Sequence, residues 1–246
     1  MSDGVRLSFD GAVAVLSLDH PPLNIYDLEM RDALIEAVTA VRDVPDVRAL
    51  LLRAEGRHFS AGADLSEFGS APSIFEARRI RWDRDPWGQL WDLPIPTVVA
   101  LHGIAVGSGL EMAMLCDVRL ASPDTRVGLP ETKLGMLPAA GGTQSLTRAV
   151  GPTASLPLVL TSATIDAAEA ERRGVVHQVV GDVEAAAASV AADLAGLDRG
   201  LAGPTRRALH AAGDLPLADG LAAEHRLARS WRVRVNSDTS QTKGGT

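Results

Sequence analysis

The sequence predicts an α/β core followed by a helical C-terminal segment. Over roughly the first 180 residues, short buried-strand patterns alternate with stretches of helical apolar spacing, an order typical of crossover units between parallel strands. After about Asp182 the pattern is alanine-rich and helical, without a strand signal. We therefore expect an α/β core over 1–190 and a helical segment over 191–235. Residues 236–246 are polar and without an apolar anchor, so we expect a disordered tail.

The first elements follow from local patterns. Apolar residues alternate with polar ones from Val5 to Phe9, and Asp10-Gly11 is a two-residue turn signal before a second apolar run, which predicts a β-hairpin. Asp27 can cap a helix, because apolar residues recur after it at helical spacing. These residues are Met30, Leu34, Ile35, Val38 and Val41. A buried strand is predicted over 47–52.

The same alternation continues along the chain. Helices are predicted over 74–91 and 109–115, and strands over 97–101, 118–121 and 175–180. Asp166 caps the helical run AAEAERR and Gly174 ends it. The tryptophans of the helix 74–91 either belong to the core or line an apolar ligand pocket; they are Trp82, Trp87 and Trp91.

Composition excludes several classes of function. Lysine and arginine total 24 against 31 aspartates and glutamates, a formal net charge of −7, so we expect no binding to nucleic acid. Cys116, the one cysteine, cannot form an internal disulfide or a multi-thiolate metal site. No signal-peptide pattern and no uncharged apolar run long enough for a membrane span is found, so we expect no membrane partner and a cytoplasmic location.

Two glycine-containing loops follow buried strands. In FSAGADL (59–65), Gly62 between two alanines permits a sharp bend that leaves backbone N–H groups accessible, although small-residue turns are also common without function. In GIAVGSGLE (103–111), Ser108 can present its backbone N–H at the start of a helix. Glu111 lies in the first turn of that helix among apolar neighbours, where a dry environment raises a carboxyl pKa.

A third segment, VGLPETKLGMLPAAGG (127–142), holds a second carboxylate. Pro130 fixes the backbone before Glu131, which predicts a turn or helix start, and Gly141 and Gly142 permit close approach of another segment. Together, two loops of amide donors and two glutamates 20 residues apart indicate chemistry on an acyl carbonyl.

Other catalytic motifs fail. Ser108 is flanked by Val106 and Leu110 where a serine-hydrolase elbow has glycines, and Met112 stands where a dinucleotide fingerprint has its third glycine. No Walker A motif is present, and the six histidines show no metal-ligand spacing, so we expect no metal and no separate cofactor.

The sequence resembles the enoyl-CoA hydratase/isomerase (crotonase) family from about residue 5 to 230. The resemblance rests on HFSAGADL (58–65), GIAVGSGLEMAMLCD (103–117) and VGLPETKLGMLPAAGGTQSLTRAVG (127–151), and PPLN (21–24) is similar to the family's first CoA-contacting loop. Ser108 and Ala139 stand where many members have glycine, and the family's C-terminal EGxxAFxxKR helix is not recognisable.

The resemblance implies the ClpP/crotonase fold, a spiral of ββα units with a helical C-terminal oligomerisation segment, as a homotrimer or homohexamer. It implies an acyl-CoA thioester substrate, so coenzyme A enters as part of the substrate. By position, the amides of Ala63 and Ser108 match the oxyanion hole, and Glu111 and Glu131 match the two catalytic glutamates. The residues matched to CoA or substrate binding are Leu23, Ala61, Gly62, Asp64, Leu65, Ser66 and Ala139.

The expected reaction is hydration of a 2-enoyl-CoA to a 3-hydroxyacyl-CoA. Glu111 is assigned by family position to activating water and Glu131 to protonating Cα. A double-bond isomerase, which can work with one carboxylate, is the nearest alternative. A non-catalytic acyl-CoA-binding homologue is a second alternative, and a serine hydrolase is a third.

Overall fold

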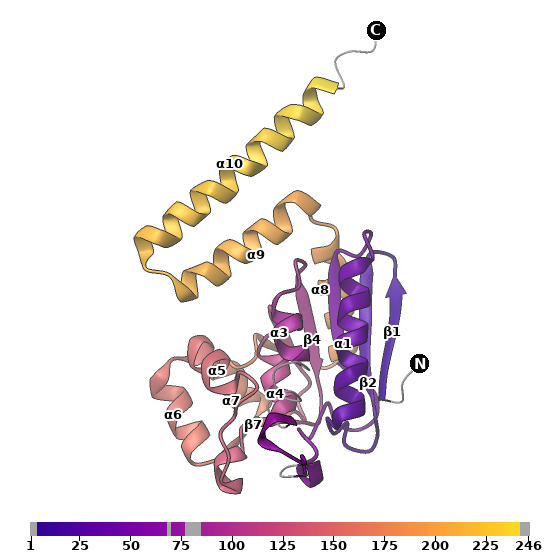
Figure 1. Ribbon diagram of the computed structural model, residues 1–246, viewed down its shortest axis with the longest axis vertical. Helices are drawn as coiled ribbons and strands as arrows, with labels where there is room; N and C mark the ends of the chain where they lie inside the picture. The colour runs from indigo at the N-terminus through magenta and orange to yellow at the C-terminus, as the bar shows by residue number, and fades with distance from the viewer. Residues whose placement is uncertain (1–3, 68–69, 77–84, 242–246) are drawn as a thin grey trace. The chain divides into compact units, whose positions relative to one another are not determined.

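The computed structural model describes residues 4–67, 70–76 and 85–241. The chain divides into two compact units, Met1–Ala195 and Gly196–Thr246. The strands are β1 (Gly4–Asp10), β2 (Val13–Asp19), β3 (Ala49–Ala54), β4 (Thr97–Leu101), β5 (Ile104–Val106), β6 (Val118–Ala121), β7 (Arg126–Gly128), β8 (Thr164–Asp166) and β9 (Gln178–Val179) (Figure 1). The α-helices are α1 (Leu28–Asp43), α3 (Pro86–Trp91), α4 (Ser108–Ala113), α5 (Gly142–Val150), α6 (Pro152–Leu160), α7 (Ala167–Arg173), α8 (Val183–Ala195), α9 (Arg199–Asp214) and α10 (Leu217–Gln241). Two short 3-10 helices are η1 (Leu65–Glu67) and η2 (Glu131–Leu134).

The larger sheet has the order β1-β2-β3-β4-β6-β9. The predicted hairpin is confirmed, since β1 and β2 pair antiparallel around the Asp10–Val13 pair, and every later neighbour in this sheet pairs parallel. The carboxyl ends of β3 and β4 therefore lie at one edge of the sheet. The loops that leave this edge carry the FSAGADL and GIAVGSGLE motifs, and ligands bind at such edges in open α/β sheets.

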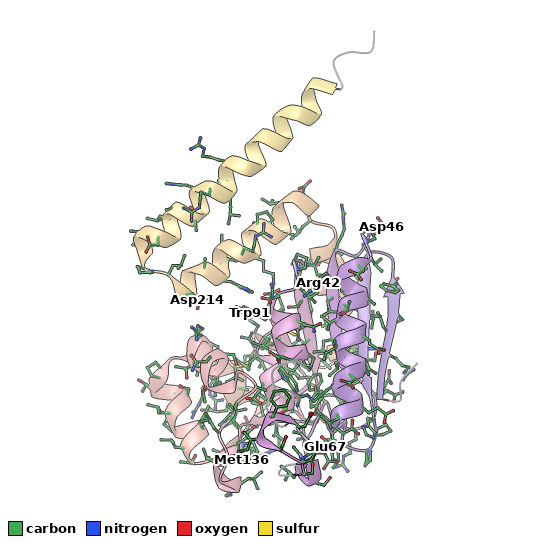
Figure 2. All side chains as sticks on the ribbon, in the orientation of Figure 1. Arg42, Asp46, Glu67, Trp91, Met136 and Asp214 are labelled. Atoms are coloured by element: carbon green, nitrogen blue, oxygen red, sulfur yellow. The ribbon has the colours of Figure 1, made fainter. Side chains whose placement is uncertain are left out.

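Both faces of the central strands of this sheet are buried. In β3, Leu50 and Leu52 belong to the core under α1, whereas Ala49 and Leu51 face the second core under α8, as the alternation of side chains along a strand requires. Helix α8 meets the sheet with a four-residue repeat of small side chains: Val183, Ala187, Ala191 and Ala195. The alanine-rich pattern of the sequence is thus a helix that packs closely on a sheet. Figure 2 shows side chains filling the layers between these elements.

A smaller sheet, β5-β7-β8, was not predicted. Each of its strands has three residues, too few for an alternation pattern to appear in the sequence. The strand predicted over 175–180 is wrong for its first half. The N–H groups of Val175 and Val176 donate to the Ala170 carbonyl as they close α7, so only Gln178–Val179 pair in the sheet.

Two further predictions concern segments that the structure describes only in part. Of the helix predicted over 74–91, residues 77–84, including Trp82, lie outside the described part, and α3 forms its end with Asp85 as N-cap. In the second unit, α10 continues to Gln241 and so includes 236–241 of the segment for which we predict a disordered tail. Residues 242–246 lie outside the described part. Among the described helices, none combines the length and the hydropathy needed to cross a membrane.

Candidate active site

The loop after β3 is held by a buried serine. The Ser60 hydroxyl donates to the Asn24 carbonyl at 2.7 Å and accepts from the Gly62 N–H at 3.1 Å. Next to it, the Ala61 N–H donates to the Leu23 carbonyl at 2.9 Å. These bonds join the PPLN segment to the FSAGADL segment, two motifs that the sequence separates by more than 30 residues.

A parallel bridge to Tyr26 fixes the bend of this loop. The Tyr26 N–H donates to the Gly62 carbonyl at 2.9 Å, and the Asp64 N–H donates to the Tyr26 carbonyl at 3.0 Å. Gly62 has a φ of +97°, a conformation that favours glycine. In a parallel bridge the residue between the two bonded groups directs its own N–H away from the partner. The Ala63 N–H accordingly has no acceptor among the described residues.

The loop after β4 reaches the same place. Gly107, with a φ of +55°, precedes Ser108, the first residue of α4, whose N–H also has no acceptor in the described part of the chain. A Cβ built on Gly62 would lie 3.2 Å from the Val106 carbonyl oxygen and 3.5 Å from the Ser108 nitrogen. The two loops with unengaged amides are therefore in direct contact.

Glu111 is buried beside these loops. Its side chain is 1% exposed, and its Oε1 accepts hydrogen bonds from the N–H groups of Ala140 and Gly142, each at 2.9 Å. A Cβ on Gly142 would lie 2.8 Å from this oxygen, so the contact needs a glycine. Two amide donors favour the ionised form of a carboxyl group.

Glu131 lies at the start of η2, after Pro130, as the sequence predicts. A Cβ on Gly107 would lie 3.0 Å from its Oε1, and its buried Oε2 has no hydrogen-bond partner among the described residues. Burial, followed by the negative charge of Glu111, raises the pKa of Glu131 to about 7. The pair thus consists of a buried carboxyl group that accepts two amide hydrogen bonds and a carboxyl group that is partly protonated at neutral pH.

The other predicted site residues lie along the same loops. Leu65 and Ser66 are exposed in η1, and the Ser66 hydroxyl and N–H lower the pKa of Asp64 by donating to its carboxylate. Ala139 is exposed and directly precedes Ala140, whose N–H binds Glu111. The predicted site residues therefore lie on loops that hydrogen bonds and close contacts connect, and Leu65 and Ala139 belong to these loops as chain neighbours of Asp64 and Ala140.

Tyr26 is the residue of this region that the sequence patterns missed. It is the one tyrosine of the chain. Its position two residues after PPLN was the signal that could have placed it in the site. The sequence left open whether Trp87 belongs to the core or lines a ligand pocket. Its side chain is 5% exposed and packs against Tyr26, with ring centroids 5.6 Å apart.

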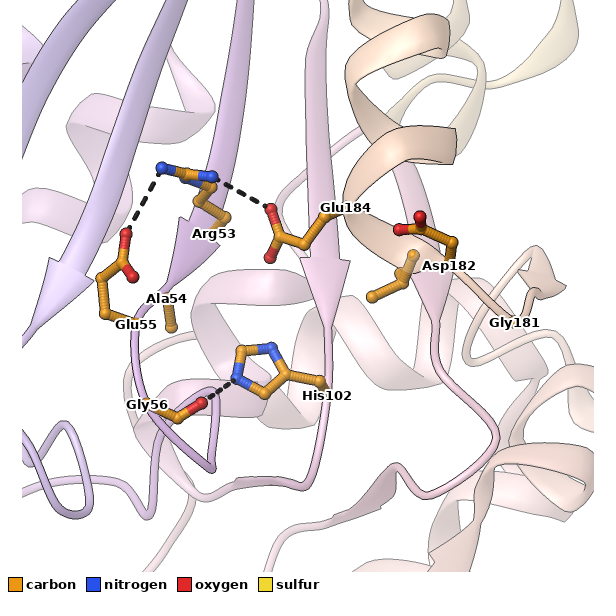
Figure 3. A pocket seen from close by; sticks show the side chains of 9 residues that line it. Arg53, Ala54, Glu55, Gly56, His102, Gly181, Asp182 and Glu184 are labelled. Atoms are coloured by element: carbon orange, nitrogen blue, oxygen red, sulfur yellow. Dashed lines mark hydrogen bonds and ion pairs between the residues drawn. The ribbon is translucent and has the colours of Figure 1, made fainter.

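A separate cavity of about 600 Å³ opens where β3 and β4 end and α8 begins (Figure 3). Arg53 crosses it, paired at 3.3 Å with both Glu55 and Glu184, and none of the predicted site residues lines it. Across the described residues, no group of three or more histidine, cysteine, aspartate or glutamate side chains could hold a metal ion.

Comparison with known proteins identifies the family of this chain. A family model described as enoyl-CoA hydratase/isomerase matches residues 8–242. A Mycobacterium leprae protein named "Probable enoyl-CoA hydratase" is 37% identical over 226 residues, covering 90% of this chain and 86% of that protein. A Bacillus subtilis protein with the same description is 36% identical over 178 residues, covering 71% of this chain and 68% of that protein.

Solved structures show the same fold. An enoyl-CoA hydratase from Bacillus anthracis superposes with a TM-score of 0.86 at 28% identity, covering 92% of this chain and 90% of that one. An enoyl-CoA hydratase from Thermoplasma volcanium gives a TM-score of 0.87 at 26% identity, covering 98% of this chain and 97% of that one. The α/β spiral predicted from the sequence is confirmed as the crotonase fold, and the chain belongs to the enoyl-CoA hydratase/isomerase family.

Proposed function

We propose that this protein adds water reversibly across the 2,3 double bond of a 2-enoyl-CoA thioester, giving the 3-hydroxyacyl-CoA. One observation carries the proposal. Glu111 and Glu131 lie so close that the charge of one raises the pKa of the other, beside two loops whose Ala63 and Ser108 amides are unengaged. Relatives named as enoyl-CoA hydratases support the same activity.

In this proposal the thioester oxygen accepts hydrogen bonds from the N–H groups of Ala63 and Ser108. Negative charge grows on that oxygen as water attacks Cβ, and preorganised donors stabilise it; loss of one such donor costs about 3–4 kcal/mol in other enzymes. The CoA portion and the acyl chain lie along residues near this pair of loops. These residues are Leu23, Ala61, Gly62, Asp64, Leu65, Ser66 and Ala139.

The two glutamates then divide the proton transfers. Glu111 accepts a proton from water, since its two amide bonds favour the carboxylate. Glu131 donates a proton to Cα, because its pKa of about 7 leaves it partly protonated at neutral pH. The reaction is a balanced addition of water, in which the proton gained by Glu111 offsets the proton lost by Glu131. It requires no metal and no redox cofactor.

We also propose a cytoplasmic homotrimer or homohexamer. Support comes from the second unit, where Leu209 and Leu217 are 69% and 79% exposed in a single chain. Large apolar side chains exposed in this number favour burial against other copies. The exposed leucines of this unit are Leu197, Leu201, Leu209, Leu215, Leu217 and Leu221.

The test of the reaction is substitution of each glutamate. Glu131→Gln and Glu111→Gln are each expected to lower kcat for hydration of but-2-enoyl-CoA by about 10²–10⁴-fold, since each removes one proton transfer, with KM little changed. Glu169→Gln, on the surface of α7 and paired with Arg172 and Arg173, is the matched control and is expected to leave turnover unchanged. Near-normal hydration by either site variant would remove that residue from the mechanism.

Product identification separates the alternatives. Each variant is tested on 2-enoyl-CoA and 3-enoyl-CoA esters over a range of chain lengths. A double-bond shift that survives in Glu111→Gln would assign an isomerase that uses Glu131 alone. Tight binding of every ester by the unmodified protein, without turnover, would assign an acyl-CoA-binding protein.

A further inference from the structure

The two amides of the proposed oxyanion hole belong to loops more than 40 residues apart in sequence. Their spacing decides whether both can reach one oxygen, because donors must lie about 2.7–3.1 Å from it. Direct contact between Gly62 and the Val106–Ser108 backbone sets a lower limit on that spacing. Backbone hydrogen bonds join the loops, because Ser60 donates to the Ile104 carbonyl at 2.9 Å and accepts from the Val106 N–H at 3.1 Å. A second connection, through side chains, acts closer to the residues that carry the two amides.

The first half of this connection is Tyr26. Its backbone is bonded on both sides of Ala63, to the Gly62 carbonyl at 2.9 Å and from the Asp64 N–H at 3.0 Å. Its side chain is 1% exposed, and its hydroxyl donates to the Met112 sulfur on α4 at 3.4 Å. Tyr26 thus connects the backbone around Ala63 to α4.

The second half is Trp87 on α3. Its indole N–H donates to the Ser108 carbonyl at 3.3 Å, and its ring lies 5.6 Å from the Tyr26 ring at an interplanar angle of 59°. This tilted arrangement is one that aromatic pairs prefer. The Arg31 guanidinium of α1 lies 5.3 Å from the centre of the Trp87 ring and holds its outer face by a cation–π contact.

We propose that the Tyr26–Trp87 pair is a positioning bridge that fixes the separation of the Ala63 and Ser108 amides. Neither ring needs to touch the substrate. Tyr26 acts through the backbone around Ala63, and Trp87 acts through the Ser108 carbonyl. The inference rests on the proposed oxyanion hole and adds the residues that hold its geometry.

The bridge is tested with Trp87→Phe, which keeps an aromatic ring and removes the indole N–H donor together with part of the buried ring volume. Loss of one hydrogen bond predicts a kcat for but-2-enoyl-CoA lowered about three- to tenfold, with KM within twofold of the unmodified protein. Trp91→Phe is the matched control, one turn further along α3 (Figure 2), and is expected to leave both constants unchanged.

A second readout reports on the amides themselves. Bound acetoacetyl-CoA has an enolate that absorbs in the near ultraviolet and places negative charge on the thioester oxygen. Trp87→Phe should lower the bound enolate fraction at fixed pH, whereas a loss of packing alone would not change it. This measurement needs thioester binding but no hydration. A failure of the proposed hydratase reaction in the unmodified protein is therefore distinct from a failure of the bridge.

The variant Tyr26→Leu, which removes the ring contact and keeps the backbone bonds, completes the test. It should lower kcat and the enolate fraction as Trp87→Phe does, and the double variant should lower them no further than the larger single effect. An unchanged enolate fraction in Trp87→Phe, or single effects that multiply fully in the double variant, would overturn the bridge. Thermal unfolding identifies any variant that fails to fold, and the other single variant then decides by its enolate fraction.

Discussion

At the scale of single residues, the proposed chemistry depends on where one carboxyl group is buried. Glu131 has an oxygen without a partner in the described part of the chain and a carboxylate, Glu111, nearby. Burial of its carboxyl group, followed by the charge of Glu111, favours the protonated form and raises its pKa to about 7. A free glutamate would be ionised at neutral pH and would be a poor proton donor to carbon.

The raised pKa predicts the pH dependence of activity. Hydration needs the pair to hold one proton, so kcat/KM should fall above about pH 7, where Glu131 loses it. Dehydration of 3-hydroxybutanoyl-CoA should show the same decrease of kcat/KM above about pH 7. The reason is that hydration takes up no net proton, so a pH-independent equilibrium constant fixes the ratio of kcat/KM in the two directions. Rates measured in both directions from pH 5 to 9 check this, and a profile that stays flat above pH 7 would contradict it.

The same group predicts an effect on stability. The pKa of Glu131 is raised from 4.5 to about 7 on folding. Its contribution to the free energy of unfolding is therefore present below pH 4.5 and is lost as the pH rises through 7. Glu131→Gln does not titrate. After allowance for solvent screening of this half-buried group, it should be more stable than the unmodified protein at pH 8 by about 1–2 kcal/mol, or a few degrees in Tm.

The control for stability is Glu169→Gln. The guanidinium groups of Arg173 and Arg172 lower the pKa of this glutamate. Its ionised form is therefore favoured in the folded protein, and Glu169→Gln cannot stabilise the fold at pH 8 by removing a destabilised charge. Thermal unfolding at pH 5 and pH 8 gives the comparison. Equal Tm differences for Glu131→Gln at the two pH values would show that the carboxyl is not destabilised by burial.

At the scale of elements, the site depends on loops that leave parallel strands at one edge. The sequence predicts the hairpin β1–β2, the strands β4 and β6, the α1 cap at Asp27 and the α7 limits at Asp166 and Gly174, and the structure confirms them. These features are local, since caps and periodicity involve residues a few positions apart. The three-residue strands β5, β7 and β8 could not be predicted, because their pairing is decided by partners distant in sequence.

The close approach of α5 to α4 gives a prediction at this scale. A Cβ in Gly142→Ala would lie 2.8 Å from Glu111 Oε1 and 3.0 Å from Leu129 Cδ1, so the carboxylate must shift from its amide donors. We expect kcat to fall at least about tenfold and the free energy of unfolding to fall by about 1–3 kcal/mol.

Gly213→Ala on α9 is the matched control for this substitution. A Cβ there has no atom within 4 Å, so activity should be unchanged and stability equal or higher by about 0.5–1 kcal/mol. Initial rates and urea unfolding of the two variants provide the measurement. Full activity in Gly142→Ala would mean that the position of Glu111 is not critical.

At the scale of the whole molecule, the second unit predicts assembly. Its exposed leucines, of which Leu209 and Leu217 on α9 and α10 are the most exposed, favour burial against other copies. The family resemblance implies three or six copies, so we expect a mass three or six times the 25.8 kDa of one chain. Sedimentation equilibrium measures this mass. Substitution of Leu209 and Leu217 by glutamate should shift it toward the single chain, and a monomeric unmodified protein would exclude the assembly.

The sequence by itself determined the fold class, the order of its main elements and the family, because these depend on local periodicity and on motifs that lie within short segments. Only the tertiary structure decided that Glu111 and Glu131 meet, that the pKa of Glu131 is raised, and that Tyr26 and Trp87 connect two loops. Burial and electrostatic coupling depend on which distant segments pack together. A pattern within one segment carries no information about the atoms that another segment brings against it.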